Sequence, residues 1–376
     1  MSPLPQALTP EALLGGPRGR RLCLEVASLA ASQAAPGPQG TEFGHARHYA
    51  AYELDPGSSH QVVLVGPGAD IEPLRPTVAE VAAVLDRVPL SIPAGDGLLQ
   101  ALAVTADNAR YWQQPDGDDH LAAAPEMRRS LHRFAVAMLE SPHAAWWSAP
   151  MAADGQWAVA FIDEPPRPMP ELRPAAAALE QGRLDVILDE VTAARDRPAD
   201  PSANWSGSWW SRPGGVSGST RMLQERGPVG LWLVEDGFGE RRATTERLEL
   251  PAELRIHEID SPAAWAQLCR DHAMDVTASK RHDWYRTTGR AGPWLMPDWA
   301  RLQDMYDGVH LTMGGYLSTA GVAIPLDGGF ATVLAGWEPD TTYWLRDVPP
   351  VAGTRQQWAQ EGSSQFWRHA SPEVAS

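Results

Sequence analysis

The sequence predicts an α+β fold, with a mixed helical N-terminal region and a strand-rich C-terminal domain. A chain of 376 residues is longer than one ordinary domain and long enough to form two. Apolar residues recur at helical spacing in the first half, whereas short β-branched or aromatic runs dominate the second. Few connections in the second half are long enough for helical crossovers between parallel strands, which favours α+β over a doubly wound sheet.

The first half is expected to be mostly helical. Glu80 stands three residues after Thr77, the spacing of a capping box, so a helix is expected to begin there. Residues 45–54 are expected to be extended, and residues 61–65 and 156–162 to be strands. Further helices are predicted over 20–32, 97–112, 125–140 and, as one or two segments, 175–195.

The second half carries most of the predicted strands, and its two clearest helices follow Ser261 and Asp298 as N-caps. A polar stretch rich in Pro, Ser and Gly follows Arg195 and predicts a boundary near residue 200. The expected layout is thus an N-terminal domain over 1–200, a strand-rich domain over 201–350 and a tail over 351–376. The predicted strands are 208–211, 228–234, 244–250, 254–259, 308–312, 331–335 and 341–345.

The net charge indicates which kinds of partner are expected, and the cysteine content indicates the compartment. A formal net charge of −16 argues against duplex nucleic acid, because phosphate binding needs clustered cations. It leaves room for a small anionic ligand in a local arginine pocket. The only cysteines, Cys23 and Cys269, lie in different predicted domains, so no disulfide framework is expected and a cytoplasmic location is predicted. No secretory signal or membrane span is predicted from the apolar runs.

Familiar site motifs are absent from the sequence. It contains no GxGxxG, P-loop, HExxH, GxSxG or paired CxxC pattern. His45 and His48 are the only neighbouring histidines. One helical turn would place them together, but the extended segment expected here places them on opposite faces, so no metal site is predicted. Lys280 is the only lysine, which we interpret as a GC-rich coding bias towards arginine.

The most distinctive stretch runs from residue 276 to 347 and begins with a group of cationic residues around Trp284 and Tyr285. One interpretation is an anion pocket, in which guanidinium groups hold phosphates and an aromatic ring holds a planar group. The other is a solvated loop that pairs with Asp275 and Asp283. The cationic group consists of Lys280, Arg281, His282, Arg286 and Arg290.

Four segments of the second half resemble a family of uncharacterised actinobacterial and phage-type proteins. They read GPVGLWLVED, RIHEIDSPAAW, PDWARLQDMYDGVHLTMGGYL and GWEPDTTYWL, in this order. The resemblance covers about residues 204–347 and implies kinship without a mechanism.

A more distant resemblance points to a reaction. The segment GVHLTMGGYLSTA is similar to the strand-then-helix of ADP-ribosyltransferase folds, although the chain has no His-Gly-Thr opening and no Glu-x-Glu. The resemblance implies an NAD-using ADP-ribosyltransferase-like or NAD-glycohydrolase-like enzyme, with a possible protein acceptor. In it Glu338 takes the catalytic position, and NAD is held by arginines and aromatic rings. These cofactor-binding candidates are Arg212, Arg221, Tyr285, Arg286 and Tyr316.

Two other functions stay open from the sequence. The chain has 16 tryptophans, and the motif Trp146-Trp147-Ser-Ala-Pro recurs as Trp209-Trp210-Ser-Arg-Pro. Tryptophan stacks on ligands and anchors partners, so a binding module with a Trp-rich surface, including the stretch EPPRPMPELRP, is one alternative. A tailoring enzyme of secondary metabolism is the other.

Overall fold

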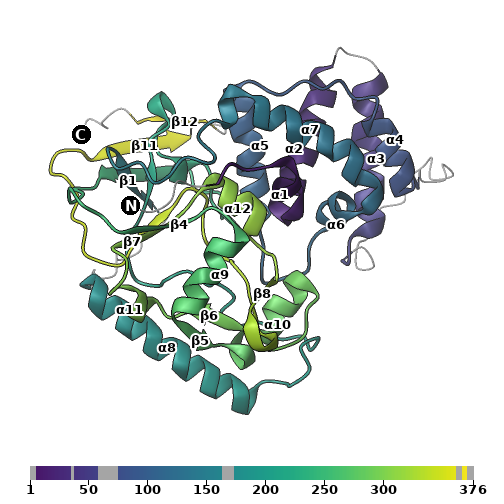
Figure 1. The fold of residues 1–376 in the computed structure, drawn as a ribbon. Helices are drawn as coiled ribbons and strands as arrows, with labels where there is room; N and C mark the ends of the chain where they lie inside the picture. Colours follow the sequence, from purple (N-terminus) through teal and green to yellow (C-terminus); the bar gives the residue numbers. More distant parts are fainter. Residues whose placement is uncertain (1–5, 35–37, 58–74, 163–172, 361–365, 371–376) are drawn as a thin grey trace, which may run out of the picture. The chain divides into compact units, whose positions relative to one another are not determined.

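The protein consists of two compact units (Figure 1). Unit 1 comprises residues 1–7, 106–112 and 147–376, and unit 2 comprises residues 8–105 and 113–146. The structure is a computed structural model that describes residues 6–34, 38–57, 75–162, 173–360 and 366–370.

Helices are the regular elements of unit 2 in its described residues, and irregular segments connect them. The capping box that begins α4 is confirmed: Thr77 Oγ1 accepts from the Glu80 backbone N–H at 3.3 Å, and the Glu80 carboxylate accepts from the Thr77 N–H at 2.7 Å. Unit 2 contains α1 (Pro10–Gly15), α2 (Pro17–Gln33), α3 (Pro38–Leu54), α4 (Val78–Leu85), most of α5 (Gly95–Asp107), η2 (Pro125–Met127), η3 (Pro142–Ala144), α6 (Gly117–Ala123) and α7 (Arg128–Glu140).

The prediction that residues 45–54 are extended is wrong, because they form the second half of α3. Packing explains the difference. Arg47 on α3 donates to Glu25 on α2 at 2.6 Å and to Asp118 on α6 at 2.8 Å, so α3 is held as a helix between two others. Tertiary contacts override a weak local pattern of this kind. The strand expected at 61–65 lies outside the described residues.

Unit 1 contains one large mixed sheet, which confirms the α+β class. Its strand order is β12-β11-β3-β1-β2-β10-β7-β4, and every pair is antiparallel except β4 with β7. The strands of this sheet are β1 (Gln156–Phe161), β2 (Gly218–Arg221), β3 (Arg242–Arg247), β4 (Ile256–Ile259), β7 (Gly308–Leu311), β10 (Thr342–Trp344), β11 (Gln356–Gln360) and β12 (Trp367–His369). Two small two-stranded antiparallel sheets pair β5 (Ala273–Asp275) with β6 (Leu295–Pro297) and β8 (Ile324–Pro325) with β9 (Ala331–Thr332).

Unit 1 also contains helices in addition to these three sheets. They are α8 (Ala175–Asp196), α9 (Pro262–Asp271), α10 (Thr277–Thr288), α11 (Trp299–Leu302) and α12 (Met313–Thr319), with short 3-10 segments η4 (Gln224–Arg226), η5 (Val229–Leu231) and η6 (Asp327–Gly329). Ser261 and Asp298 cap α9 and α11 through their side chains, as predicted. Among the helices in the described ranges, none has both the length and the apolar composition that a bilayer-spanning segment needs.

The boundaries differ from those expected near residues 200 and 350. Residues 147–200 belong to unit 1 because β1 pairs with β2 and β3, while α8 packs against α10 and α11. Residues beyond 350, expected to be a tail, instead supply β11 and β12, and β11 extends the sheet beside β3. The polar stretch near residue 200 therefore does not mark the boundary, because the strands and helices that pack together are far apart in the sequence.

Two predicted strands are absent as strands. Residues 228–234 form the 3-10 segment η5 and a turn, and residues 208–211 are irregular. The segment at 208–211 nevertheless forms two hydrogen bonds with Ala335. The Ser211 N–H donates to the Ala335 carbonyl at 2.8 Å, and Ser211 Oγ accepts from the Ala335 N–H at 2.9 Å. Conversely, the cationic stretch considered as a solvated loop is helix α10.

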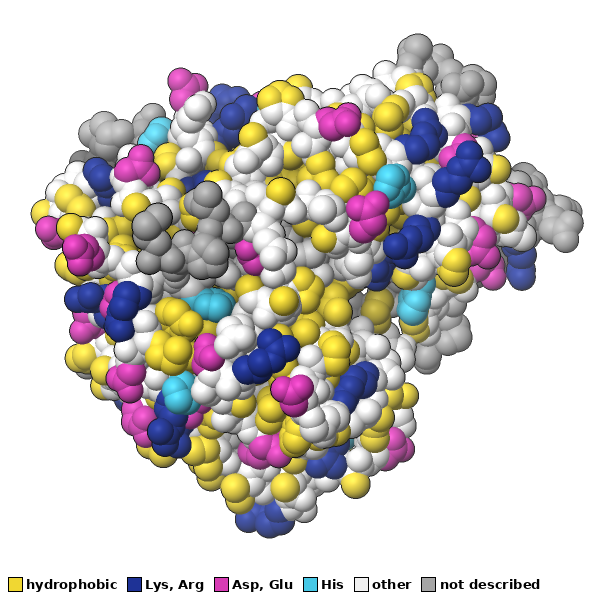
Figure 2. All heavy atoms as spheres, in the orientation of Figure 1, with side chains coloured by type: hydrophobic (Ala, Val, Ile, Leu, Met, Phe, Trp, Pro, Cys, Tyr) yellow, Lys and Arg dark blue, Asp and Glu magenta, His cyan; other side chains and the backbone are white. Residues whose placement is uncertain are grey.

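Tryptophans build the core of unit 1 rather than a surface. Ten of the 16 tryptophans are buried, and Trp265, Trp299 and Trp337 form a cluster with ring centroids 5.6–6.1 Å apart. Tyr343 extends the cluster, 4.9 Å from Trp337 in an edge-to-face arrangement. On the face that Figure 2 shows, acidic and basic side chains are interspersed among apolar atoms.

Candidate functional site

A cavity of about 1250 Å³ in unit 1 is the strongest site candidate. It lies between α8 and the irregular segment 208–216, and α8 follows one edge of the unit beside α11, β5 and β6 (Figure 1). We call it the α8 pocket. Its polar lining includes Arg173, Arg183, Asp189, Ser208, Arg212 and Lys280, and its apolar lining includes Trp210, Met274, Met296 and Trp299.

Small residues let α8 lie close to the opposite wall. Ala178 and Gly182 face the glycine pair of that wall: a Cβ added to Gly215 would lie 3.4 Å from the Ala178 Cβ, and one added to Gly182 would lie 3.9 Å from the Gly214 carbonyl oxygen. Both are van der Waals contact distances, so larger side chains at these positions would press against the opposite wall.

Hydrogen bonds fix α8 against its neighbours at three places. The Asp347 carboxylate accepts from the Ala175 N–H at 2.7 Å and so satisfies a free donor at the helix start. Arg183 donates to Asp298, the N-cap of α11, at 3.0 Å. Glu190 accepts from the N–H groups of Ala278 and Ser279 at 2.7 and 2.8 Å and caps α10. The pocket wall is therefore rigidly attached.

The opposite wall, residues 208–213, is held by indole groups and by one glycine. Trp284 Nε1 donates to the Trp209 carbonyl at 2.8 Å, and Trp299 Nε1 donates to the Ser211 carbonyl at 3.1 Å. Gly336 passes so close that an added Cβ would lie 2.7 Å from the Trp210 Cβ, and its φ of +70° also favours glycine. These contacts present the Trp210 ring, which remains 44% exposed, at the pocket.

Arg212 connects the pocket with Glu338. Its guanidinium lies over the Tyr343 ring, 5.5 Å from the centroid, and the Tyr343 hydroxyl donates to Glu338 Oε2 at 2.7 Å. Within the described residues Arg212 has no carboxylate at ion-pair distance. Burial opposes the charge of Arg212, but Tyr343, Glu338 and Glu235 outweigh it and raise its pKa. A half-buried guanidinium of this kind can accept an anionic group from a ligand.

Lys280, on α10, lies in the same pocket wall and is 2% exposed. Its Nζ donates to the Ser208 carbonyl at 2.6 Å and to Ser208 Oγ at 2.9 Å, and it lies 5.8 Å from the Trp210 ring centroid. Burial lowers the pKa of this amine to about 8. Its neutral form is therefore populated near neutral pH.

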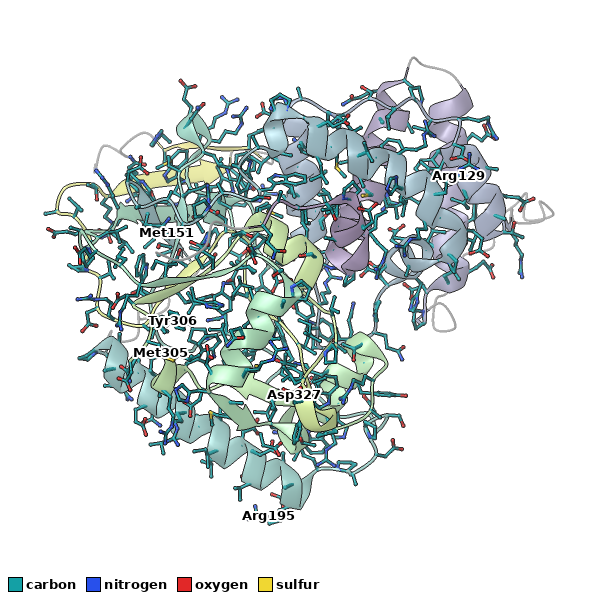
Figure 3. The ribbon with its side chains drawn as sticks, in the orientation of Figure 1. Arg129, Met151, Arg195, Met305, Tyr306 and Asp327 are labelled. Atoms are coloured by element: carbon teal, nitrogen blue, oxygen red, sulfur yellow. The ribbon has the colours of Figure 1, made fainter. Side chains whose placement is uncertain are left out.

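A second charged group lies inside the sheet and has a structural role. His310 on β7 is fully buried between two carboxylates: Nδ1 donates to Glu258 Oε2 at 2.5 Å, and Nε2 lies 3.4 Å from Asp340 Oδ1. Arg221 Nε donates to Asp340 at 2.6 Å, and the Glu258 carboxylate also accepts from the N–H of Met151, labelled in Figure 3, at 3.0 Å. This chain of charges extends over four strands or strand ends, and His310 within it has no exposed surface.

The pH dependence of stability follows from His310. Burial opposes its charge, but Glu258 and Asp340 outweigh burial and raise its pKa from 6.5 to about 9. Between these values only the folded state holds the proton, so the free energy of unfolding falls as pH rises, by about 3 kcal/mol in all. The Lys280 amine contributes the opposite trend, but only between about 8 and its ordinary 10.5.

Between pH 6.5 and 8 the His310 contribution is not opposed by that of Lys280. We expect the free energy of unfolding to fall by about 2 kcal/mol across this range, measured by denaturant titrations followed by tryptophan fluorescence. Every tryptophan except Trp146 belongs to unit 1, so the signal reports that unit. A His310→Asn variant should show a flattened profile, and an equal slope in both proteins would contradict the assignment.

The remaining predicted site residues are placed apart from the α8 pocket. Arg221 belongs to the charge chain, where its guanidinium also donates to the Ala149 and Pro150 carbonyls at 3.2 and 2.9 Å. Tyr316 is fully buried on α12. The structure thus brings Arg212 and Glu338 together through Tyr343. Of the predicted site residues only Arg212 is in the pocket lining; Glu338, Arg221 and Tyr316 are not.

Tyr285 and Arg286, at the end of α10, also lie outside the pocket lining. Arg286 donates to the Trp205 carbonyl and to Asp283 at 2.9 Å. The cationic stretch therefore divides: its first member, Lys280, faces the pocket, while Arg286 fastens α10 to the chain before it.

Two signals in the sequence pointed to the pocket. Lys280 is the only lysine among 30 arginines, although coding bias alone accounts for that composition. The motif from Trp209 to Pro213 was visible as a repeat, and two of its residues, Trp210 and Arg212, line the cavity. Nothing in the sequence indicated that α8 would form the opposite wall.

No family model matches the chain, and comparisons with curated proteins and with solved structures also find no match. Within the described ranges, no cluster of three or more His, Cys, Asp or Glu side chains is placed to hold a metal ion.

Proposed function

We propose that unit 1 binds NAD in the α8 pocket and cleaves its nicotinamide–ribose bond, as an ADP-ribosyltransferase-like or NAD-glycohydrolase-like enzyme. The observation that carries the proposal is Arg212. It lines the pocket, has no ion pair among the described carboxylates, and lies beside the Tyr343–Glu338 hydrogen bond.

The pocket offers the two kinds of contact that a dinucleotide needs. Arg212 supplies a guanidinium for a phosphate, which arginine binds by paired hydrogen bonds. Trp210 supplies an exposed indole on which a planar ring can stack. A cavity of about 1250 Å³ is large enough for a dinucleotide rather than a fragment of one.

The proposal assigns the chemistry to Glu338. Loss of nicotinamide leaves positive charge on the ribose carbon, and a fixed carboxylate nearby stabilises that charge as it develops. The Tyr343 hydroxyl positions this carboxylate by its hydrogen bond of 2.7 Å. Arg212, held beside the same tyrosine ring, fixes the distance between the bound phosphate and the reacting bond.

NAD binding is tested by replacing Arg212. We expect millimolar NAD to raise the melting temperature of the native protein, because a ligand that prefers the folded state stabilises it. In Arg212→Leu the affinity should fall about 10- to 100-fold, the range for a lost hydrogen bond to a charged group. Calorimetric titration measures this change directly.

The matched control is Arg195→Leu. Arg195 is also on the pocket-forming helix α8, but its side chain is 73% exposed at the end of the helix (Figure 3). It should bind NAD as the native protein does. Absence of NAD binding by the native protein, or equal affinity in both variants, would overturn the proposal.

A binding module that uses a Trp-rich surface has less support. Most tryptophans are core residues, and of the Trp209–Trp210 pair only Trp210 is more than a third exposed. That residue belongs to the pocket rather than to a broad surface.

A further inference from the structure

Lys280 stands apart from the other cationic residues in chemistry as well as in number. The other 30 of the 31 Lys and Arg residues are arginines. Arginine stays protonated at any physiological pH and cannot supply a nucleophilic amine, whereas a lysine that is desolvated can. The one lysine of the chain is in the wall of the α8 pocket.

The surroundings of Lys280 leave its amine without a direct counter-ion. Asp189 is paired with Arg197, and Asp283 is paired with Arg286 at 2.9 Å, so both carboxylates already have an arginine partner. Asp189, Asp283 and Glu190 still favour the charged amine, but burial outweighs them. Among the described residues, the amine forms hydrogen bonds only with Ser208, through the carbonyl and the hydroxyl. Without a salt bridge, burial dominates and favours the neutral form.

The neutral amine is oriented by these two contacts. A neutral primary amine has two hydrogens and one lone pair. The Ser208 carbonyl and hydroxyl, at 2.6 and 2.9 Å, can take both hydrogens, which leaves the lone pair for a third direction. The Trp210 ring lies 5.8 Å from the nitrogen, at the distance where a planar ligand could be held against the indole.

A path for protons leads away from the amine. Lys280 Nζ donates to Ser208 Oγ, and Ser208 Oγ donates in turn to Asp189 Oδ2 at 3.1 Å. Asp189 is on α8, so the path joins the two walls of the pocket. Such a relay allows a proton to leave the nitrogen and to return to a nearby oxygen.

We propose that Lys280 is a reactive amine that condenses with an aldehyde or ketone ligand of the α8 pocket and forms an imine. The ligand class is an anionic carbonyl compound, ideally with a planar ring, because Arg212 offers a cation and Trp210 an aromatic face in the same cavity. The inference goes beyond NAD cleavage and depends on the pocket, not on NAD.

The reaction is balanced without an oxidant or reductant. The nitrogen lone pair attacks the carbonyl carbon, the C=O π pair moves to oxygen, and one proton passes from nitrogen to that oxygen. The resulting carbinolamine loses its hydroxyl group with the second nitrogen proton as water, and a C=N bond remains. Ser208 and Asp189 carry these protons.

The single lysine makes the test unusually direct. The full-length protein is incubated at pH 7.5 with pyridoxal 5′-phosphate, an aromatic aldehyde with a phosphate, and then reduced with borohydride. Only Lys280 and the α-amino group can retain the label, and peptide mass spectrometry separates them. We expect the label on Lys280. Because its pKa is about 8 rather than 10.5, the free-amine fraction at pH 7.5 is about 200-fold higher than in the unfolded chain, and labelling should be at least about tenfold faster.

Two variants complete the test. Lys280→Arg keeps the charge and should lose the label except at the α-amino group. Ser208→Ala keeps the lysine, so it should still be labelled, but more slowly and with a shifted pH dependence because the relay is broken. Label confined to the α-amino group of the native protein, or Lys280 labelling no faster than in urea, would overturn the proposal. Either result leaves NAD binding by Arg212 unaffected, so the two proposals fail separately.

Discussion

Replacement of His310 by leucine is expected to lower the free energy of unfolding of unit 1 by about 3–5 kcal/mol, the range for breaking a buried charge pair. The side chain is fully buried and joins Glu258 on β4 to Asp340 beside β10. Leucine fills much of the volume but leaves the Glu258 carboxylate facing an apolar group. Asp340 keeps Arg221, so most of the loss comes from Glu258.

Denaturant titration followed by tryptophan fluorescence measures this loss. The double variant Glu258→Gln/His310→Leu serves as the matched control, since the amide still accepts from the Met151 N–H while the stranded charge is gone. It should recover a substantial part of the stability lost in His310→Leu. A loss below about 1 kcal/mol in the single variant would show that the charge chain does not stabilise the sheet.

Glu338→Gln is expected to reduce nicotinamide release from NAD about 100-fold or more while binding persists. Glutamine keeps the shape and can still accept from the Tyr343 hydroxyl, so the fold and the Arg212 contact should survive. What is lost is the negative charge that stabilises the developing oxocarbenium ion. Release of nicotinamide, measured by chromatography, tests this prediction together with NAD affinity.

The exposed Glu253 provides a control for the removal of one negative charge. Glu253→Gln should release nicotinamide at the native rate. Tyr343→Phe removes the hydrogen bond to Glu338 but keeps its carboxylate. Its rate of nicotinamide release should lie between those of Glu338→Gln and Glu253→Gln, with a larger effect on kcat than on NAD affinity. Unchanged turnover in Glu338→Gln would remove Glu338 from the mechanism.

Local signals in the sequence predicted local structure well. Thr77 with Glu80, and Ser261 with Pro262, identify helix starts because capping satisfies donors within the same few residues. Several strands, such as 244–250 and 254–259, were also located to within a few residues. The α+β class followed from counting such elements.

Features set by distant contacts were not predictable in this way. Residues 45–54 are helical because Arg47 reaches carboxylates on two other helices. The predicted domain boundary near residue 200 is wrong because α8 packs against α10 and α11, about 100 residues later in the chain. The same reason applies to the site: a resemblance identifies Arg212 and Glu338 as candidates, but only the folded chain places Tyr343 between them and α8 across the pocket from Arg212.

Hydrogen exchange with and without NAD tests most directly whether the α8 pocket is the ligand site. We predict that NAD slows exchange in peptides covering residues 178–189 of α8 and residues 208–216 of the opposite wall, with little change in β11 and β12 at the far end of the sheet order. Slowed exchange that avoids both pocket walls, or no change at saturating NAD, would contradict the account.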